Sequence, residues 1–148
     1  MPHPEITPEG LRAFFERFQS LSAAFDVERL ATMYAESVMV AGPKGAQVVR
    51  SADLQRAIPK RRQLLESAGY RGTALVGFDE TALTDRYALV RAEFRWGFQG
   101  ANGEPATVTL PSTFIVDRVG DSPRIVVYMN EQDVVSVLRE RGVLPSVS

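Results

Sequence analysis

The sequence predicts an α+β fold in which helices of the N-terminal half cover a curved antiparallel sheet. Two observations predict this class. Apolar residues recur at helical spacing over the first third of the chain, and from residue 73 onward apolar and polar residues alternate between short glycine-rich turns. A curved sheet with so few strands cannot close on itself, so helices have to cover its concave face. The space between sheet and helices is then either a filled core or a pocket.

Three helices are expected before the long strands. Thr7 has the character of an N-cap for the first, with Pro8 at the first helical position. Asp26 is expected to cap a short second helix, and Ser51 a third, in which Pro59 should kink or split the helix. The first helix carries an aromatic stripe at helical spacing: Leu11, Phe14, Phe15, Phe18, Leu21 and Phe25.

A small hairpin, four long strands and a last helix make up the rest. The hairpin turns at Gly42-Pro43-Lys44-Gly45, and in the second long strand Arg91, Glu93 and Arg95 point away from an apolar face. The expected strands span residues 37–41, 47–50, 73–83, 87–98, 107–118 and 124–130, and the last helix spans residues 131–141.

Length and composition indicate one ordinary globular unit. A chain of 148 residues with 45% hydrophobic and 24% charged residues fits a single domain. We expect an N-terminal tail over residues 1–7, the domain over 8–142 and a C-terminal tail over 143–148. The net charge of -1 gives no electrostatic footprint for nucleic acid. The absence of a leader pattern and of a long apolar run predicts a cytoplasmic protein with no membrane partner.

The residue inventory also restricts the chemistry. The chain has no cysteine, which excludes disulfides, thiolate nucleophiles and cysteine-type zinc sites. Its one histidine, His3, lies in the N-terminal tail, which argues against a histidine-ligated metal or a Ser-His-Asp triad. No metal and no cofactor are therefore expected.

The order of elements resembles the nuclear transport factor 2-like superfamily, which includes ketosteroid isomerases, polyketide-cyclase-like proteins and scytalone dehydratase. The resemblance runs from about Pro8 to about Arg141 and is carried by four segments: residues 26–40, the turn 42–45, Leu110-Pro111-Ser112-Thr113-Phe114, and Met129-Asn130-Glu131. It implies a cone-shaped curved antiparallel sheet packed on three N-terminal-half helices, plus a short C-terminal helix. Many relatives dimerise through the outer sheet face, so the resemblance also implies a homodimer.

The isomerase members of that superfamily use a Tyr, an Asp base and a protonated Asp. By resemblance these positions fall on Phe18, Gly42 and Thr113, none of which can perform the required step. The dehydratase-type histidines are absent. Epoxide-hydrolase-type members use an Asp-Arg-Asp set. The candidates in this chain are Arg91, Glu93 and Arg95 on one strand and Asp117 on its neighbour, and the first three are expected to face outward. The known catalytic routes of the superfamily therefore lose their residues.

The expected cavity lining is mostly apolar and aromatic. The aromatic members either enclose a ligand or simply fill the core. Thr113 either orients a carbonyl or hydroxyl of the ligand or is satisfied by a neighbouring backbone carbonyl. The residues expected to bind ligand are Phe14, Phe18, Tyr34, Val40, Phe94, Trp96, Thr113, Ile115, Val127 and Met129.

Several polar groups remain open between two interpretations. Arg91, Glu93 and Arg95 form either a solvated ladder or part of a dimer interface, and Arg56, Lys60, Arg61 and Arg62 are expected to form a solvated basic face. Asn130 either caps the last helix or lies at the cavity mouth with Glu131. Tyr70 and Tyr128 could each supply a phenol, as could Tyr34. Glu36 and Asp117 are the acids expected nearest the interior.

Three functions compete at this point. The first is a protein that binds, or an enzyme that transforms, a small apolar ring-sized molecule. The second is a non-catalytic homodimeric interaction module. The third, a polyketide-cyclase-like enzyme, rests on the resemblance alone, because one fold can host many chemistries.

Overall fold

The computed structural model describes residues 8–99, 103–120 and 122–143 and confirms the α+β class. The helices are α1 (Pro8–Ala23), α2 (Val27–Ala31), α3 (Ser51–Ser67) and α4 (Val134–Glu140). The strands are β1 (Tyr34–Gly42), β2 (Gly45–Arg50), β3 (Tyr70–Ala82), β4 (Tyr87–Gln99), β5 (Pro105–Asp117) and β6 (Arg124–Asn130). The predicted cap Thr7 and the predicted turn at residues 100–102 lie outside the described residues.

All six strands form one sheet in the order β2-β1-β6-β5-β4-β3. Four of the five neighbouring pairs are antiparallel, as predicted for this sheet, and the exception is the pair of β1 and β6, which run parallel. The reason is connectivity. Tight turns force antiparallel pairing on strands that follow one another, whereas β1 and β6 are distant in the chain and no hairpin sets their direction.

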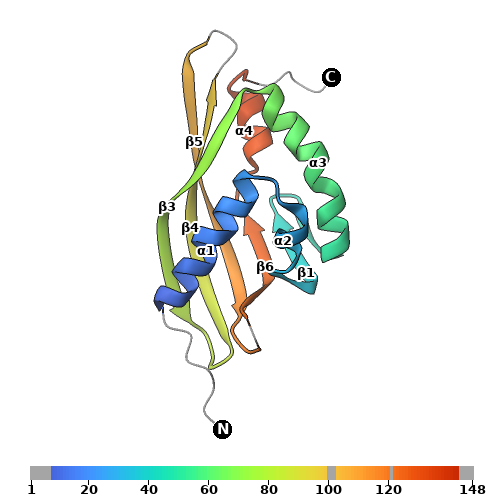
Figure 1. The fold of residues 1–148 in the computed structure, drawn as a ribbon, viewed down its shortest axis with the longest axis vertical. Coiled ribbons are helices and arrows are strands. Elements are labelled where there is room, and N and C mark those ends of the chain that lie inside the picture. Colours follow the sequence, from blue (N-terminus) through green and yellow to red (C-terminus); the bar gives the residue numbers. More distant parts are fainter. Residues whose placement is uncertain (1–7, 100–102, 121, 144–148) are drawn as a thin grey trace.

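Helix α3 lies across the open side of the curved sheet. It packs against β1 and β2 near one edge and against β3 at the other edge. Helix α1 packs on β3, and α2 contacts both α1 and α3 (Figure 1). The concave face of the sheet is therefore enclosed by α1 and α3, which positions the cavity described below.

The ends of the helices follow local chemistry with two corrections. Asp26 caps α2 as predicted, its Oδ1 accepting the backbone N–H of Arg29 at 3.3 Å. Ser51 does not cap α3, because Arg50 occupies the cap position and the Ser51 hydroxyl donates to the Ala31 carbonyl instead. Pro59 does not split α3. It lies on an exposed part of the helix, where a carbonyl left without its partner can be hydrated.

Gly69 fixes the end of α3 against β4. Its φ of +77° is in the left-handed region, and a Cβ there would clash with the Gln99 carbonyl oxygen. The Gln99 N–H in turn donates to the Gly69 carbonyl at 2.8 Å. Because only glycine tolerates both the conformation and the close approach, this residue sets the distance between α3 and the sheet.

The core is built around aromatic rings between α1 and the sheet. Phe15 is fully buried and packs on Phe114 of β5, with ring centroids 4.7 Å apart. A second cluster lies beneath α4, and Trp96 contacts both clusters. Helix α4 begins after its cap Asp133, later than the predicted start at Glu131, and buries Val134, Val135, Val137 and Leu138. None of the helices described in residues 8–99, 103–120 and 122–143 is long and apolar enough to cross a membrane.

Candidate functional site

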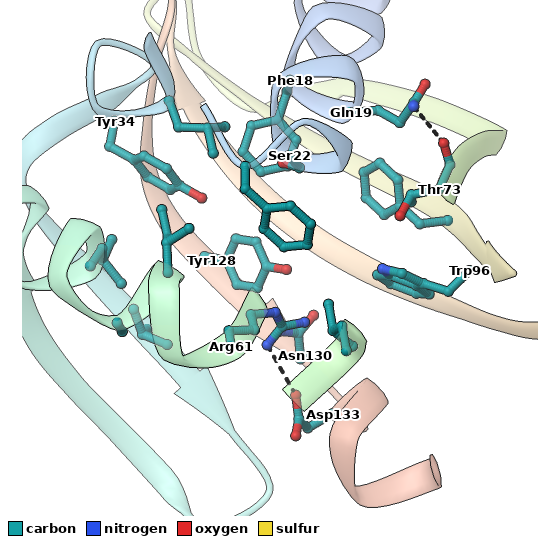
Figure 2. A pocket seen from close by; sticks show the side chains of 18 of the residues that line it. Phe18, Gln19, Ser22, Tyr34, Arg61, Thr73, Trp96, Tyr128, Asn130 and Asp133 are labelled. Carbon is teal, nitrogen blue, oxygen red and sulfur yellow. Dashed lines mark hydrogen bonds and ion pairs between the residues drawn. The ribbon is translucent and has the colours of Figure 1, made fainter. Parts of the chain in front are cut away.

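A cavity of about 440 Å³ lies between α1, α3 and the concave face of the sheet (Figure 2). Residues from every layer of the fold contribute to its wall. They are Phe18, Gln19, Ser22, Phe25, Leu30, Tyr34, Val40, Leu54, Ala57, Ile58, Arg61, Leu65, Tyr70, Thr73, Phe94, Trp96, Tyr128, Asn130 and Asp133.

One wall of the cavity is aromatic. The Phe18 ring of α1 lies 6.2 Å from Phe94 and 6.0 Å from Tyr34, measured between centroids. Phe94 lies 6.0 Å from Trp96 along β4. Phe114 supports this wall from within the core, 5.7 Å from Phe18. Phe18 packs edge to face on Tyr34 and Phe114, whereas the Phe18–Phe94 and Phe94–Trp96 pairs are tilted, and together these rings present an apolar surface to the cavity.

Two phenol groups face this wall from the other side. The hydroxyls of Tyr34 and Tyr128 both point toward the middle of the cavity (Figure 2). Burial raises the pKa of Tyr34 well above its ordinary value, the neighbouring Tyr128 raises it further, and the Arg61 charge lowers it. Tyr34 is therefore a neutral phenol throughout the physiological range and can donate a hydrogen bond to a ligand oxygen.

A second polar group lies beside Trp96 on β3. The Tyr70 hydroxyl and the Thr73 hydroxyl share a hydrogen bond, and Gln19 of α1 donates its side-chain N–H to the Thr73 carbonyl oxygen. Burial raises the pKa of Tyr70, while the Thr73 bond and the Arg61 charge lower it. These contacts fix Gln19 and Tyr70 to the sheet and hold the edge of the cavity in place.

Asn130 enters the cavity from the end of β6. Its Oδ1 accepts a hydrogen bond from Ser112 Oγ at 2.7 Å, which leaves the amide N–H groups for other partners. Of the two interpretations of Asn130, capping of the last helix is wrong, and a position in the cavity lining is found for Asn130 but not for Glu131. Asp133 caps that helix, accepting the Ser136 N–H, and Asn130 contributes to the lining instead.

The charged lining residues come from α3 and from the start of α4. Arg61 Nη1 lies 3.4 Å from Asp133 Oδ1, and both side chains are partly exposed. The expectation of a solvated basic face is met only in part by Arg61, which lines the cavity and pairs with Asp133 while 42% of its side chain stays exposed. It holds for Arg56, Lys60 and Arg62, which are exposed.

Half of the residues predicted to bind ligand line the cavity. These are Phe18, Tyr34, Val40, Phe94 and Trp96. Phe14 does not line it and packs against the edge of the core instead.

Thr113, Ile115, Val127 and Met129 do not share the interior, and this expectation is corrected. Thr113 pairs with Arg91 and with Met129, so it lies on the outer face of the sheet with them. The inward residues of β5 are Val108, Leu110, Ser112, Phe114 and Val116, which are all buried. Thr113 lies between the inward residues Ser112 and Phe114, and because side chains alternate along a strand, a difference of one residue places it on the other face.

The three positions that resemble the catalytic groups of the isomerases do not meet at one point. Phe18 lines the cavity, Gly42 is exposed at the end of β1, and Thr113 faces outward. The residues in β5 that do face inward beside Thr113 are Ser112 and Phe114. Neither a carboxylate base nor an acidic donor occupies these places.

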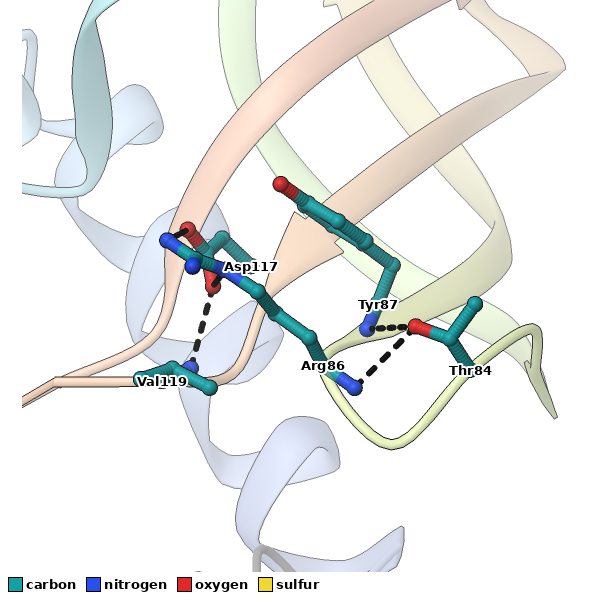
Figure 3. A network of polar contacts seen from close by, with 5 residues as sticks. All are labelled: Thr84, Arg86, Tyr87, Asp117 and Val119. Carbon is teal, nitrogen blue, oxygen red and sulfur yellow. Dashed lines mark hydrogen bonds and ion pairs between the residues drawn. The ribbon is translucent and has the colours of Figure 1, made fainter.

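The two acids predicted nearest the interior also lie away from the cavity. Glu36 is exposed on β1. Asp117 ends β5 and accepts two hydrogen bonds from Arg86, at 3.0 and 2.8 Å, and a third from the Val119 N–H (Figure 3). The Arg86 bonds hold the pKa of Asp117 below its ordinary value. Asp117 therefore joins the turn after β3 to the end of β5 and has a structural role.

Within the described residues, no group of three or more Asp, Glu or His side chains is arranged to hold a metal ion. The ionisable groups of the lining are Tyr34, Tyr70, Tyr128, Arg61 and Asp133. Because Asp133 is engaged by Arg61 and by the first turn of α4, the arrangement favours hydrogen bonding to a ligand over removal of a proton from it.

Comparison with solved structures shows the same fold in proteins of low sequence identity. An NTF2-like protein with a cystatin-like fold from Novosphingobium aromaticivorans is 18% identical, with a TM-score of 0.70 over 93% of this chain and 88% of that one. Aln2 from a Streptomyces species is 15% identical, with a TM-score of 0.69 over 93% and 97%. The β subunit of benzoate 1,2-dioxygenase from Burkholderia mallei is 14% identical, with a TM-score of 0.69 over 88% and 97%.

The comparison with curated proteins gave no match. The family model described as "NTF2-like protein (DUF6841)" matches residues 7–133, which include every element from α1 to β6. The resemblance inferred from the sequence is thus confirmed at the level of the family. This chain belongs to the NTF2-like family of that model.

Proposed function

We propose that this protein binds a small, largely apolar, ring-sized molecule in the cavity between α1, α3 and the sheet. The observation that carries the proposal is the aromatic wall of Phe18, Phe94 and Trp96 facing an open volume of about 440 Å³. Ligand sites are typically cavities of about this size, lined by apolar and aromatic groups with a few polar groups among them. Solved NTF2-like structures support the fold of such a site, not its ligand.

The phenol groups of Tyr34 and Tyr128 enable the site to donate hydrogen bonds to a ligand. Tyr34 and Tyr128 direct hydroxyls at the space in front of the aromatic wall (Figure 2). A ligand with a carbonyl or hydroxyl oxygen on its ring body can accept a hydrogen bond there while its rings contact Phe18 and Phe94. One such bond in a partly dry site contributes about 0.5–1.5 kcal/mol.

Fluorescence of Trp96 gives a direct test, because it is the only tryptophan and lies in the wall of the cavity. The neutral probe N-phenyl-1-naphthylamine should quench Trp96 and brighten on binding. In Val40→Phe the new ring occupies cavity space, and we expect the affinity for the probe to fall at least about tenfold, the effect of about 1.4 kcal/mol. Val76→Phe is the matched control, since Val76 is 45% exposed on β3 and outside the lining.

Two results would count against the proposal. One is that the wild-type protein leaves the probe fluorescence unchanged at saturating concentrations. The other is that Val40→Phe and Val76→Phe bind the probe equally well, which would locate binding somewhere other than the cavity. Thermal denaturation of both variants verifies that each is folded.

A second candidate function is a homodimeric interaction module that uses the outer face of the sheet, and the exposed apolar side chains there favour it. Met39 is 43% exposed and Val48 is 66% exposed, and Val127 and Met129 lie beside them on β6. A second copy is the occupant that fits. The alternation of Arg91, Glu93 and Arg95 on the same face places both signs of charge together, as a two-fold interface requires for self-complementarity.

Light scattering tests this candidate. The wild-type protein should have the mass of a dimer, and Val127→Arg should convert it to a monomer, because a buried unpaired charge strongly disfavours an interface. Gln63→Arg places the same charge at an exposed position of α3, on the opposite side of the sheet from that face, and should leave the dimer intact. A wild-type monomer at all concentrations would contradict this candidate.

A further inference from the structure

Arg61 occupies an unusual place on α3. The inward side of this helix is marked by Leu54, Ile58 and Leu65, which line the cavity at spacings of four and seven residues. Arg61 lies between Ile58 and Leu65 on the same side. Among the lining residues in the described part of the chain, it is the one cation. Its side chain is 42% exposed, so the guanidinium lies at the open edge of the cavity, where solvent and a ligand can both reach it.

The neighbouring arginines of α3 already have partners within the helix. Arg56 Nη1 lies 2.9 Å from Asp53, and Arg62 Nε lies 2.8 Å from Glu66. The guanidinium of Arg62 also lies 5.2 Å from the centre of the Phe25 ring. The two ion pairs are the usual ones between residues three and four apart on a helix surface. Arg61 differs in its ion pair, which is with Asp133 at the start of α4 and not with a residue of α3.

That contact uses little of the hydrogen-bonding capacity of Arg61. One nitrogen, Nη1, reaches one oxygen of Asp133 at 3.4 Å, which is near the outer limit of a hydrogen bond. The other oxygen of Asp133 accepts the Ser136 N–H at 3.3 Å and caps α4. A guanidinium has five N–H donors in a planar fork that matches a carboxylate with two parallel bonds. The Asp133 carboxylate does not engage it in this way.

We propose that the ligand of the cavity is a ring-bearing organic acid whose carboxylate is bound by Arg61. This inference rests on the proposed function and names the class of molecule that the same site takes. The ring body contacts Phe18, Phe94 and Trp96, while the carboxylate lies at the α3 side of the cavity, where Arg61 is 42% exposed and accessible. Asp133 competes for the same guanidinium and repels a second carboxylate, so it limits the affinity for acids.

The test compares two probes of the same shape and different charge. 1-Naphthoate carries the carboxylate, and 1-naphthamide replaces it with a neutral amide. Quenching of Trp96 at pH 7 should show tighter binding of naphthoate by the wild-type protein. In Arg61→Gln the affinity for naphthoate should fall roughly 10- to 100-fold, as expected for hydrogen bonds to a charged group, while that for naphthamide should change by no more than about twofold.

Three further variants test whether the change in naphthoate affinity comes from the Arg61 guanidinium itself. Arg56→Gln removes a positive charge from the outward side of α3 and should leave both affinities unchanged. Arg61→Lys keeps the charge without the planar fork and should bind naphthoate with intermediate affinity. Asp133→Asn retains an oxygen for the α4 cap, removes the competing charge and should tighten naphthoate binding.

The outcomes distinguish a failure of the proposed ligand binding from a failure of the proposed carboxylate binding by Arg61. If N-phenyl-1-naphthylamine fails to bind, the cavity is not a ligand site and the inference about Arg61 fails with it. If that probe binds but the wild-type protein does not prefer naphthoate to naphthamide, the acid-binding role alone is overturned. Equal loss of both naphthyl probes in Arg61→Gln, with an unchanged Arg56→Gln control, would show that Arg61 only supports the shape of α3.

Discussion

Ser112 on β5 donates its hydroxyl to the side-chain oxygen of Asn130 on β6 at a distance of 2.7 Å. Ser112 is 2% exposed and is the buried polar residue of the described core. Its bond fixes the Asn130 amide, so that the oxygen faces the sheet and the N–H groups are left for the cavity. This pair orients one of the polar groups of the cavity lining.

Ser112→Ala should destabilise the protein by about 0.5–1.5 kcal/mol, because the part-buried Asn130 oxygen loses a hydrogen bond. Thr113→Ala, one residue along and on the outer face, should cost less than about 0.5 kcal/mol. Urea denaturation of both variants measures the difference. Equal losses would contradict the observed register of β5.

Ser112 and Thr113 also show how far the sequence alone can predict which side chains of a strand face the cavity. In β5 the apolar residues Val108, Leu110, Phe114 and Val116 repeat every second position, and they are the buried face. This alternation is enough to identify the inward side of β5, whereas the expectation drawn from the resemblance put Thr113 there and was wrong. In β6 nearly every residue is apolar, and the register with β5 shifts between Ile115 and Val116. No pattern in the sequence could have specified which of its side chains face the cavity.

Tyr34 should make the stability of the protein sensitive to alkaline pH. Burial raises its pKa in the folded state above the ordinary value of 10.0, so the unfolded chain loses this proton first as the pH rises. The stabilisation is fully present below pH 10 and is lost progressively above it, by up to about 1.4 kcal/mol per pH unit. In Tyr34→Phe the free energy of unfolding should therefore fall less steeply between pH 10 and 11. Parallel curves for wild type and variant in urea denaturation would exclude this effect.

Adjacent phenylalanines on α1 should differ strongly in their contribution to stability. Phe15 is fully buried against Phe114 and Phe78, and Phe15→Ala should cost about 3–5 kcal/mol through lost contacts and the cavity left behind. Phe14 is only partly buried, and Phe14→Ala should cost about 1–2 kcal/mol. Chemical denaturation distinguishes them. Equal costs would mean that α1 is rotated about its axis relative to the structure.

Helical spacing in the sequence also indicates part of the cavity lining. Arg61 follows Ile58 by three residues and precedes Leu65 by four, so it falls on the stripe that those apolar residues define. The local composition indicates a solvated face instead, because Arg56, Lys60 and Arg62 are close to Arg61 in the sequence. Asp133 and Tyr128 could not be placed in the same way. Their positions depend on where β6 ends and on the parallel pairing of β6 with β1, which sequence separation does not constrain.

Asp117 should govern part of the acid stability through its contacts with Arg86 (Figure 3). The Arg86 bonds lower the pKa of Asp117 in the folded state below the ordinary 3.8, so the stabilisation is present above that pH and is lost as the pH falls through the folded value. Asp117→Asn should lower the melting temperature at pH 7 and flatten its decline between pH 4 and pH 2. Glu104→Gln, at an exposed position near the start of β5, should retain the wild-type acid profile.

Substitution of Arg86 tests whether the effect of Asp117 on acid stability depends on the contact between these two residues. Arg86→Gln removes the donor of the two bonds while leaving the carboxyl in place, so its acid profile should resemble that of Asp117→Asn. Because both substitutions break the same contact, the double variant should be about as stable as either single one and not show the sum of their effects. Additive losses, measured by thermal denaturation at pH 7, would mean that Asp117 acts mainly through the Val119 N–H and the turn that it closes.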